Sequence, residues 1–143
     1  MIVKSILSVK GHDVLTTSPT TTLAEGAKTL AEKRIGALVI TGADNRVVGI
    51  VTERDIVRAI AAHGASALTM AVSEFMTRKV VTCSEADTVA SIMEQMTAGK
   101  FRHIPVVEGH RLVGIVSIGD VVKWRLHEME QEHSALRDYI QTA

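Results

Sequence analysis

The chain contains two copies of one sequence pattern, and this internal repeat constrains its fold more than any other feature. In each copy a Gly-Ile-Val run is followed directly by a hydroxyl residue and, three positions later, by an aspartate. The equivalent residues are 65 or 66 positions apart: Thr16 and Thr82, Thr22 and Thr88, Gly49 and Gly114, Thr52 and Ser117, Asp55 and Asp120. A unit of this length cannot bury its own apolar face, so we expect two units to pack face to face about a pseudo-twofold axis.

Each repeat is predicted to contain a strand, a helix, two further strands and a second helix. In the first repeat, Thr22 and Glu25 form a capping pair that opens a helix, and Gly36 is expected to end it. Two β-branched runs on either side of a turn then indicate paired strands. The predicted elements are a strand at 14–17, a helix at 22–33, strands at 37–41 and 47–52, and a helix at 55–64.

The same signals recur in the second repeat. A strand is predicted at 80–82, and Ser84 with Asp87 forms a second capping pair before a helix that ends near Gly99. Two short apolar runs, Arg102–Val107 and Leu112–Ser117, flank a polar turn and predict a hairpin that leads into another helix. Ahead of both repeats, apolar residues at helical spacing predict a short helix at 2–9.

Composition excludes several classes of protein. The chain has 143 residues, 46% of them hydrophobic, a formal net charge of zero and one cysteine. A balanced charge gives no broad electrostatic footprint for nucleic acid or anionic lipid, and no apolar run approaches the roughly 18 residues of a membrane span. The lone Cys83 cannot form an internal disulfide, and no signal peptide is evident at the start. We therefore expect a soluble cytoplasmic protein that binds neither nucleic acid nor membrane.

Beyond Asp120 an apolar stripe continues for about twenty residues and predicts a long helix. Its members recur at spacings of three, four and seven, interrupted by His133: Val121, Val122, Leu126, Met129, Leu136, Tyr139 and Ile140. A helix that overhangs a small lobe must bury such a stripe against its own chain or against another chain. A second subunit is the favoured interpretation, and the chain's own hairpin is the alternative.

Duplicated strand–helix–strand–strand–helix units with this signature resemble the CBS (cystathionine beta-synthase) domain pair, also called a Bateman module. The stretches that carry the resemblance are Gly49–Asp55, Arg102–Val107 and Val116–Val122, which are similar to stand-alone CBS-pair proteins of bacteria and plant organelles. The resemblance implies an α/β (α+β) fold of two CBS repeats at 8–64 and 73–125. A helical extension at 126–143 and a short N-terminal helix complete the expected architecture.

The resemblance also implies a function. CBS pairs bind adenosine ligands such as AMP, ADP, ATP, NAD-type dinucleotides or S-adenosylmethionine, usually as homodimers, and require no catalytic cofactor. We therefore expect a non-catalytic, adenine nucleotide-binding sensor that dimerises through its CBS faces and C-terminal helix, with energy sensing as one possible use. The alternative is a dimeric adaptor that needs no ligand and regulates a partner enzyme, for example one of thioredoxin type.

The aspartate of each signature has two possible roles. A hydroxyl residue three positions before an aspartate is a common helix-capping pattern, which alone explains Thr52 with Asp55 and Ser117 with Asp120. In CBS modules, however, an aspartate in this position commonly holds the ribose hydroxyls, while the neighbouring Ser or Thr lies near the phosphate. A carboxylate can accept two such hydroxyl donors, so the sequence leaves capping and ligand binding both open.

The resemblance extends the predicted ligand site to residues on both repeats. Gly119 would let a phosphate approach the backbone, whereas the equivalent Arg54 offers a fork of donors. Arg102 and His103 are plausible phosphate contacts, with a solvated surface residue and a structural histidine as the respective alternatives. Adenine would lie against aliphatic side chains and strand backbone. The remaining candidates are Thr16, Gly36, Ala37, Leu38, Thr82, Ile104 and Pro105.

The cysteine and the histidines of the sequence give little support for catalysis or for metal binding. Cys83 with His103 as its base could in principle form a nucleophilic pair, but no lysine or arginine at a helix N-terminus is placed to activate the thiol. The histidines lack metal-ligand spacing, since His127 and His133 lie six apart and off one helical face. The sequence therefore predicts neither an enzyme nor a metal site.

Overall fold

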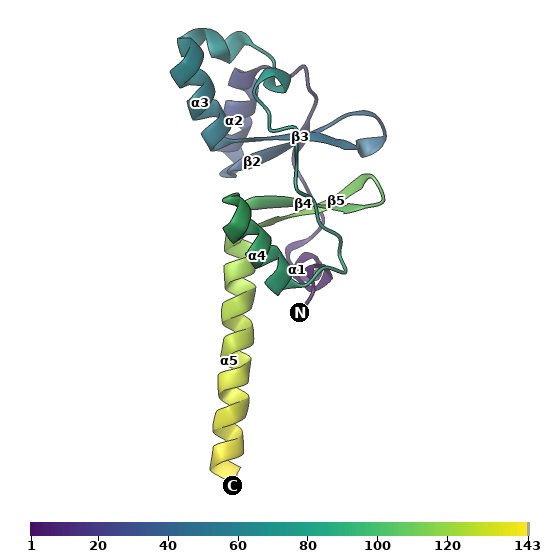
Figure 1. Ribbon diagram of the computed structural model, residues 1–143, viewed down its shortest axis with the longest axis vertical. Helices are drawn as coiled ribbons and strands as arrows, with labels where there is room; N and C mark the ends of the chain where they lie inside the picture. Colours follow the sequence, from purple (N-terminus) through teal and green to yellow (C-terminus); the bar gives the residue numbers. More distant parts are fainter. Residues whose placement is uncertain (143) are drawn as a thin grey trace.

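A computed structural model describes residues 1–142 and shows two α/β lobes stacked end to end, with one helix projecting from the second lobe (Figure 1). The first lobe is built from the first repeat. Its elements are β1 (Thr16–Thr17), α2 (Leu23–Lys33), β2 (Ala37–Thr41), the 3-10 turn η1 (Ala43–Asn45), β3 (Val47–Thr52) and α3 (Glu53–His63). Two more 3-10 turns, η2 (Gly64–Thr69) and η3 (Val72–Glu74), follow along the chain.

The second lobe holds the second repeat together with the N-terminal helix. Its elements are α1 (Val3–Lys10), α4 (Val89–Gly99), β4 (His103–Glu108), β5 (Arg111–Ser117) and α5 (Ile118–Thr142). In the first lobe, β1 pairs in parallel with β2, which pairs antiparallel with β3; in the second lobe, β4 and β5 form an antiparallel pair. The predicted fold class, with a short N-terminal helix and a long C-terminal one, is confirmed.

Equivalent positions of the two repeats meet where the lobes touch. Arg46 of the first repeat forms a β-bridge with Arg111 of the second, 65 positions later. The Asn45 side chain next to it donates a hydrogen bond of 3.2 Å to the carbonyl oxygen of Leu112. A residue can contact its own equivalent only near a symmetry axis, so these contacts agree with the pseudo-twofold packing expected from the repeat.

Each lobe completes its core with a segment from outside its own repeat. The N-terminal helix α1 packs into the second lobe through Val3, Ile6 and Leu7, all fully buried. The segment after α3 packs into the first lobe through Val72 and Met76. Because each lobe needs a segment of chain beyond its own sheet, the two lobes are joined by packing as well as by connectivity.

Three local predictions were wrong. The strand predicted at 80–82 does not form, because Cys83 alone reaches the sheet and bridges to Val106. Ser84 and Asp87 close a turn instead of capping α4, whose cap is Thr88. Helix α2 ends at Lys33 through Arg34, which adopts the left-handed conformation (φ 54°), and not through Gly36. The Thr22 cap is confirmed, since its Oγ1 accepts the Glu25 amide at 3.2 Å.

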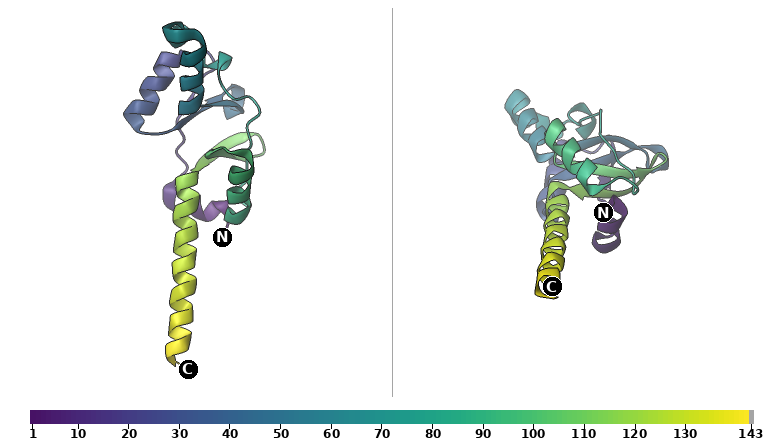
Figure 2. Two further views of the ribbon diagram at one scale, coloured as in Figure 1. Left: turned by 60° about the vertical axis from the view of Figure 1, so that its left-hand side comes forward. Right: turned by 60° about the horizontal axis from the view of Figure 1, so that its bottom comes forward.

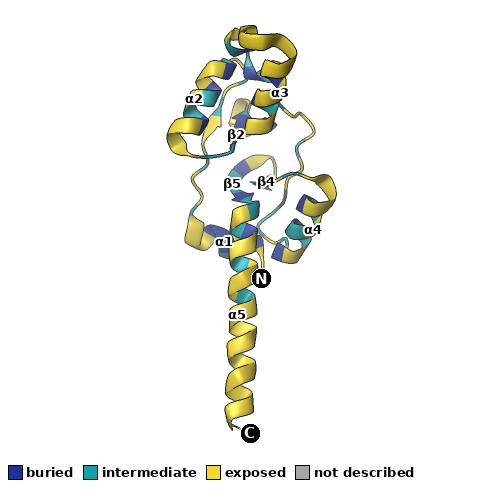
Figure 3. Ribbon diagram, turned by 90° about the vertical axis from the view of Figure 1, so that its left-hand side faces the viewer, coloured by how far each residue is buried: buried dark blue, intermediate teal, exposed yellow. Residues whose placement is uncertain are grey.

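Helix α5 is the longest element, with 25 residues that run without interruption from the end of β5 (Figure 2). Its first turns pack on the second lobe through Val121, and every residue from 129 to 142 is exposed (Figure 3). The predicted extension therefore begins inside this helix, and its last residue, Ala143, lies outside the described residues. None of the helices in the described part of the chain combines the length and apolar character that crossing a bilayer requires.

The glycines of the two Gly-Ile-Val runs are places of close approach. A Cβ on Gly114 would lie 2.8 Å from both terminal methyl groups of Leu7. A Cβ on the equivalent Gly49 would collide with the sulfur of Met76. The glycines thus leave room for the side chains by which the α1 segment and the segment after η3 cover these strands.

We expect Gly114→Ala to lower the free energy of unfolding by about 1–3 kcal/mol, because the added methyl group overpacks a core that contains the fully buried Leu7. Gly26→Ala is the matched control, since its Cβ would make ordinary contacts of 3.5 Å and 3.9 Å inside helix α2. There, alanine should be neutral or stabilise by up to about 1 kcal/mol. Urea unfolding of both variants measures the difference, and equal stabilities would contradict the close packing.

Candidate functional site

A cavity of about 320 Å³ lies between the two lobes, where the N-terminal segment crosses from one to the other. Its walls come from three places: the end of α1 with the segment that follows it, the loop between α2 and β2, and the facing strands β4 and β5. The lining residues are Lys10, Asp13, Val14, Leu15, Arg34, Ile35, Gly36, Ala37, His103, Ile115 and Ser117. The cavity therefore joins residues of both repeats.

At the edge of this cavity, Asp120 is held in a fixed position by the first turn of α5. Its Oδ2 accepts hydrogen bonds from the amide of Ser117 at 2.9 Å and from the Ser117 hydroxyl at 3.0 Å. The Ser117 Oγ in turn lies 3.2 Å from the Asp120 amide. The capping interpretation is thus correct for this pair. The cap also fixes the orientation of the carboxylate.

Lys10 connects Asp120 to the cavity. Its ammonium group donates to Asp120 Oδ2 at 2.6 Å and to the carbonyl oxygen of Ile115 at 2.8 Å. Partial burial alone would raise the pKa of Asp120, but the hydrogen bonds from Lys10 and from Ser117, with the charge of Lys10, bring that pKa below its usual value. Asp120 is therefore a carboxylate, and a cation of the same chain is its partner.

The equivalent aspartate of the first lobe has the same cap but no lysine. Asp55 Oδ2 accepts from the Thr52 amide at 2.9 Å and from the Thr52 hydroxyl at 3.1 Å, which completes a capping box. The position equivalent to Ile115 is Ile50, whose carbonyl oxygen already accepts the Thr77 amide at 2.8 Å. Thr77 thus occupies the carbonyl oxygen that corresponds to the one bound by Lys10 in the second lobe. The clearest difference between the lobes is therefore the Lys10 ammonium group beside Asp120.

His103 lies close to Gly36 of the other lobe. A Cβ on Gly36 would come within 3.2 Å of the His103 ring, with the Glu53 carboxylate 3.8 Å away. Burial is the largest cause that lowers the pKa of His103, and Lys10 and Arg102 act in the same direction. Glu53 and Asp120 oppose them. A neutral imidazole is thus favoured at the centre of the interface between the lobes.

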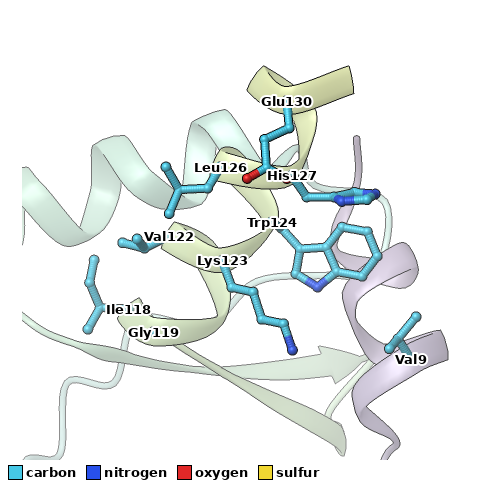
Figure 4. Close-up of a pocket in the computed structure, with 9 residues that line it drawn as sticks. All are labelled: Val9, Ile118, Gly119, Val122, Lys123, Trp124, Leu126, His127 and Glu130. Carbon is cyan, nitrogen blue, oxygen red and sulfur yellow. The ribbon is translucent and has the colours of Figure 1, made fainter. Parts of the chain in front are cut away.

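The cavity brings together only part of the predicted site. Gly36, Ala37, His103 and Ser117 line it, and Asp120 adjoins it through Lys10. Two groups of predicted residues lie apart from it. Leu38, Ile104 and Pro105 are buried in the sheets, whereas Thr16, Arg54, Thr82 and Arg102 are exposed. Gly119 lines a different cavity, on the outer side of α5 (Figure 4).

Sequence reasoning missed the charged residues contributed by segments outside the strand ends. Lys10, Asp13 and Arg34 line the cavity, and Glu53 approaches Gly36. Lys10 is the last residue of α1, and that helix was expected only to pack. One signal could have identified them. The chain must pass from α1 to β1 across the interface between the repeats, so the polar residues of this connecting segment lie near strand ends of both repeats.

Cys83 and the histidines are the side chains considered above for catalysis and for metal binding. Burial raises the pKa of the Cys83 thiol to about 12, and Asp87 contributes further, so this buried sulfur stays protonated. Within residues 1–142, no three His, Cys, Asp or Glu side chains gather in a way that could hold a metal ion. The polar groups beside the cavity form hydrogen bonds and one ion pair, as the contacts of Asp120 show.

The lowered pKa of His103 predicts a pH dependence of stability. The unfolded chain takes up a proton near pH 6.5, whereas the folded protein resists protonation until a lower pH. The contribution of His103 to stability is therefore present above pH 6.5 and is lost as the pH falls toward the folded-state value. Thermal melting from pH 7.5 to 5.5 should show a smaller loss for His103→Gln than for the unaltered protein. An identical loss would contradict the burial of this ring.

Comparison with known proteins agrees with the repeat. The CBS domain family matches the chain twice, over residues 3–62 and 72–127. A mitochondrial CBS domain-containing protein of Arabidopsis thaliana is 37% identical over 124 residues, which is 84% of this chain and 60% of that protein. The chain thus spans less than two thirds of the length of this curated relative.

Solved structures share the arrangement of both lobes. A CBS-domain protein from Agrobacterium tumefaciens is 51% identical with a TM-score of 0.84, covering 87% of this chain and 99% of that one. A CBS domain protein from Pyrobaculum aerophilum, complexed with AMP, is 31% identical with a TM-score of 0.75, covering 84% and 89%. A CBS domain pair in complex with 5′-methylthioadenosine and S-adenosyl-L-methionine is 29% identical with a TM-score of 0.80, covering 90% and 98%.

The two family matches together cover most of the sequence, and each contains one copy of the duplicated signature. The similar structures cover nearly the whole chain at this level of identity. The protein belongs to the CBS-domain family and carries one CBS domain pair.

Proposed function

We propose that this protein is a regulatory module that binds an adenosine nucleotide in the cavity between its lobes and acts as a homodimer. The observation that carries the proposal is the Asp120 carboxylate. It is oriented by Ser117, paired with Lys10 and placed at the edge of a cavity that both repeats line. The complexes of related CBS proteins with AMP and with S-adenosylmethionine support a ligand of this class.

The ribose is assigned to Asp120. Its Oδ2 already accepts the Ser117 donors, so the other oxygen and the position of the Lys10 ammonium group are where two ribose hydroxyls would bind. A carboxylate accepts such hydroxyls through charge-assisted hydrogen bonds, each contributing about 1.5–3 kcal/mol. Ribose binding at this point requires Lys10 to release Asp120.

Lys10 then becomes the candidate phosphate contact. It is exposed at the end of α1, and its flexible stem can turn a strongly hydrated ammonium group from Asp120 toward the cavity. When the phosphate replaces Asp120 as the anionic partner of Lys10, the positive charge of Lys10 stays compensated. Arg34 and His103, which also line the cavity, are further donors for a phosphate.

The base is assigned to the aliphatic part of the cavity. Val14, Ala37 and Ile115 supply apolar surface, and backbone N–H and C=O groups of these segments are the candidates for reading the edge of the adenine. Since the walls belong to both repeats, a bound nucleotide contacts the two lobes at once. Binding therefore favours one relative position of the lobes, and this coupling is the basis of the regulatory role we propose.

Asp120→Asn is expected to weaken AMP binding by about 1–2 kcal/mol, roughly ten-fold in Kd, while the fold is retained. Ser117 is the N-cap and Asp120 is the third residue of α5, where the side-chain oxygen of asparagine can still accept the Ser117 amide, so loss of this capping contact does not explain such a change. Asp55→Asn is the matched control, because it has the same cap without the lysine. Titration calorimetry with AMP, ATP, NAD and S-adenosylmethionine measures both variants.

Unchanged affinity in Asp120→Asn would contradict the assignment of the ribose. Equal losses in both variants would indicate two similar sites, one in each lobe. If none of the four ligands bound the unaltered protein at millimolar concentration, the nucleotide function would be wrong, and the ligand-independent adaptor would take its place.

Lys10→Met tests the phosphate contact separately, because it keeps the length of the stem and removes the charge. We expect AMP to bind several-fold more weakly, whereas adenosine, which has no phosphate, binds as well as before or more tightly because Asp120 is released. Lys4→Met, on the same helix, is the control and should change neither affinity. Equal weakening for AMP and adenosine would show that Lys10 only positions Asp120.

A further inference from the structure

The exposed face of α5 carries a regular apolar seam. Its members lie alternately four and three residues apart and are 43–64% exposed, apart from the histidine: Val122, Leu126, Met129, His133, Leu136 and Ile140. Spacing of this kind is the a/d pattern of a two-stranded coiled coil, with Leu126, His133 and Ile140 at a and the others at d. Beyond its first turns α5 projects away from the lobes, and every residue from 129 to 142 is exposed (Figure 3).

The charges beside the seam distinguish the two ways in which a second copy could pair. The flanking e positions are Lys123, Glu130 and Arg137, and the g positions are Arg125, Glu132 and Tyr139. A parallel pair places each g residue opposite the e residue five positions later on the partner helix. That joins Arg125 to Glu130 and Glu132 to Arg137, two attractive pairs that each occur twice.

An antiparallel pair with the same seam has the opposite electrostatics. Positions of the same kind would then face each other across the interface, which brings Glu130 against Glu130, Glu132 against Glu132 and Lys123 against Arg137. Each of these contacts is repulsive. The sequence on the exposed face therefore favours a parallel, in-register partner of the same sequence.

We propose that two copies of this chain join through α5 as a parallel coiled coil. This inference rests on the homodimer of the proposed function and specifies its orientation. The groove at the base of α5 is continuous with the seam, since Val122 and Leu126 line it together with Lys123 and Glu130 (Figure 4). A parallel arrangement brings the second lobes of both copies to the same end of the coil and covers this groove.

His133 has a defined place in this arrangement. It lies at an a position near the middle of the seam and contacts Arg137 of its own helix at 3.1 Å. In a parallel pair the two copies of His133 face each other, whereas in an antiparallel pair each would face Met129. A single polar residue at a specifies register at a cost in stability, so His133→Leu should tighten the dimer.

The decisive experiment exchanges the charges of one predicted pair. Glu132 and Arg137 are five residues apart on a helix, a spacing at which they cannot contact each other within one chain. Glu132→Arg and Arg137→Glu should each raise the dimer dissociation constant, measured by sedimentation equilibrium at low salt, by roughly ten-fold. The double variant should return to within about two-fold of the unaltered protein.

Asp138→Arg is the matched control, because it makes the same charge change on the outer face of α5 and should leave the constant unchanged. Failure of the double variant to recover would overturn the parallel pairing. A monomer at all concentrations would overturn the coiled coil together with the homodimer. Nucleotide affinity is measured on the same samples, so loss of the dimer with retained AMP binding separates this inference from the nucleotide function.

Cross-linking gives an independent readout of orientation. The seam from 122 to 140 is about 27 Å long, since a helix rises about 1.5 Å per residue, and a disulfide needs Cα atoms within about 7 Å. Ile140→Cys should therefore form a disulfide-linked dimer under mild oxidation only if the helices are parallel. The buried Cys83 is not expected to compete. An Ile140→Cys protein that stays uncross-linked while dimeric in sedimentation would overturn the parallel arrangement.

Discussion

The covering of each lobe by a segment from outside its own repeat is the constraint on which the rest of the structure depends. Leu7 packs against Gly114 in one lobe, and Met76 packs against Gly49 in the other. Since neither repeat can bury its sheet alone, the chain must cross between the lobes twice. The first crossing, from α1 to β1, forms one wall of the cavity and places Lys10 next to Asp120.

The same exchange of segments makes the two halves of the module unequal. Both aspartates are fixed by nearly identical caps, so the difference between the sites does not arise in the signature itself. It arises in the backbone next to it, where Thr77 occupies the carbonyl of Ile50 and Lys10 occupies that of Ile115. The duplicated signature thus gives one aspartate that is paired with Lys10 and one that is held only by its own capping box.

Two interfaces of different character follow from this architecture. The contact between the lobes includes polar and charged side chains, since His103 meets Gly36 beside Glu53. The face of α5 is apolar with charged margins and stands away from the lobes. Because α5 begins at Ile118, directly after Ser117 and two residues before Asp120, the proposed site and this helix are joined without an intervening loop.

The sequence alone determined the repeat, the order of most elements, the Thr22 cap of α2 and the long C-terminal helix, because these depend on local spacing and on apolar periodicity. The tertiary structure determined the features that depend on contacts between distant segments. It replaced the strand expected at 80–82 by a single bridge at Cys83 and moved the cap of α4 to Thr88. It also brought Lys10 to Asp120, 110 residues away. That contact forms because α1 covers the second lobe, where Leu7 packs on Gly114. No local pattern in α1 or in the Gly114 strand indicates which lobe α1 will cover.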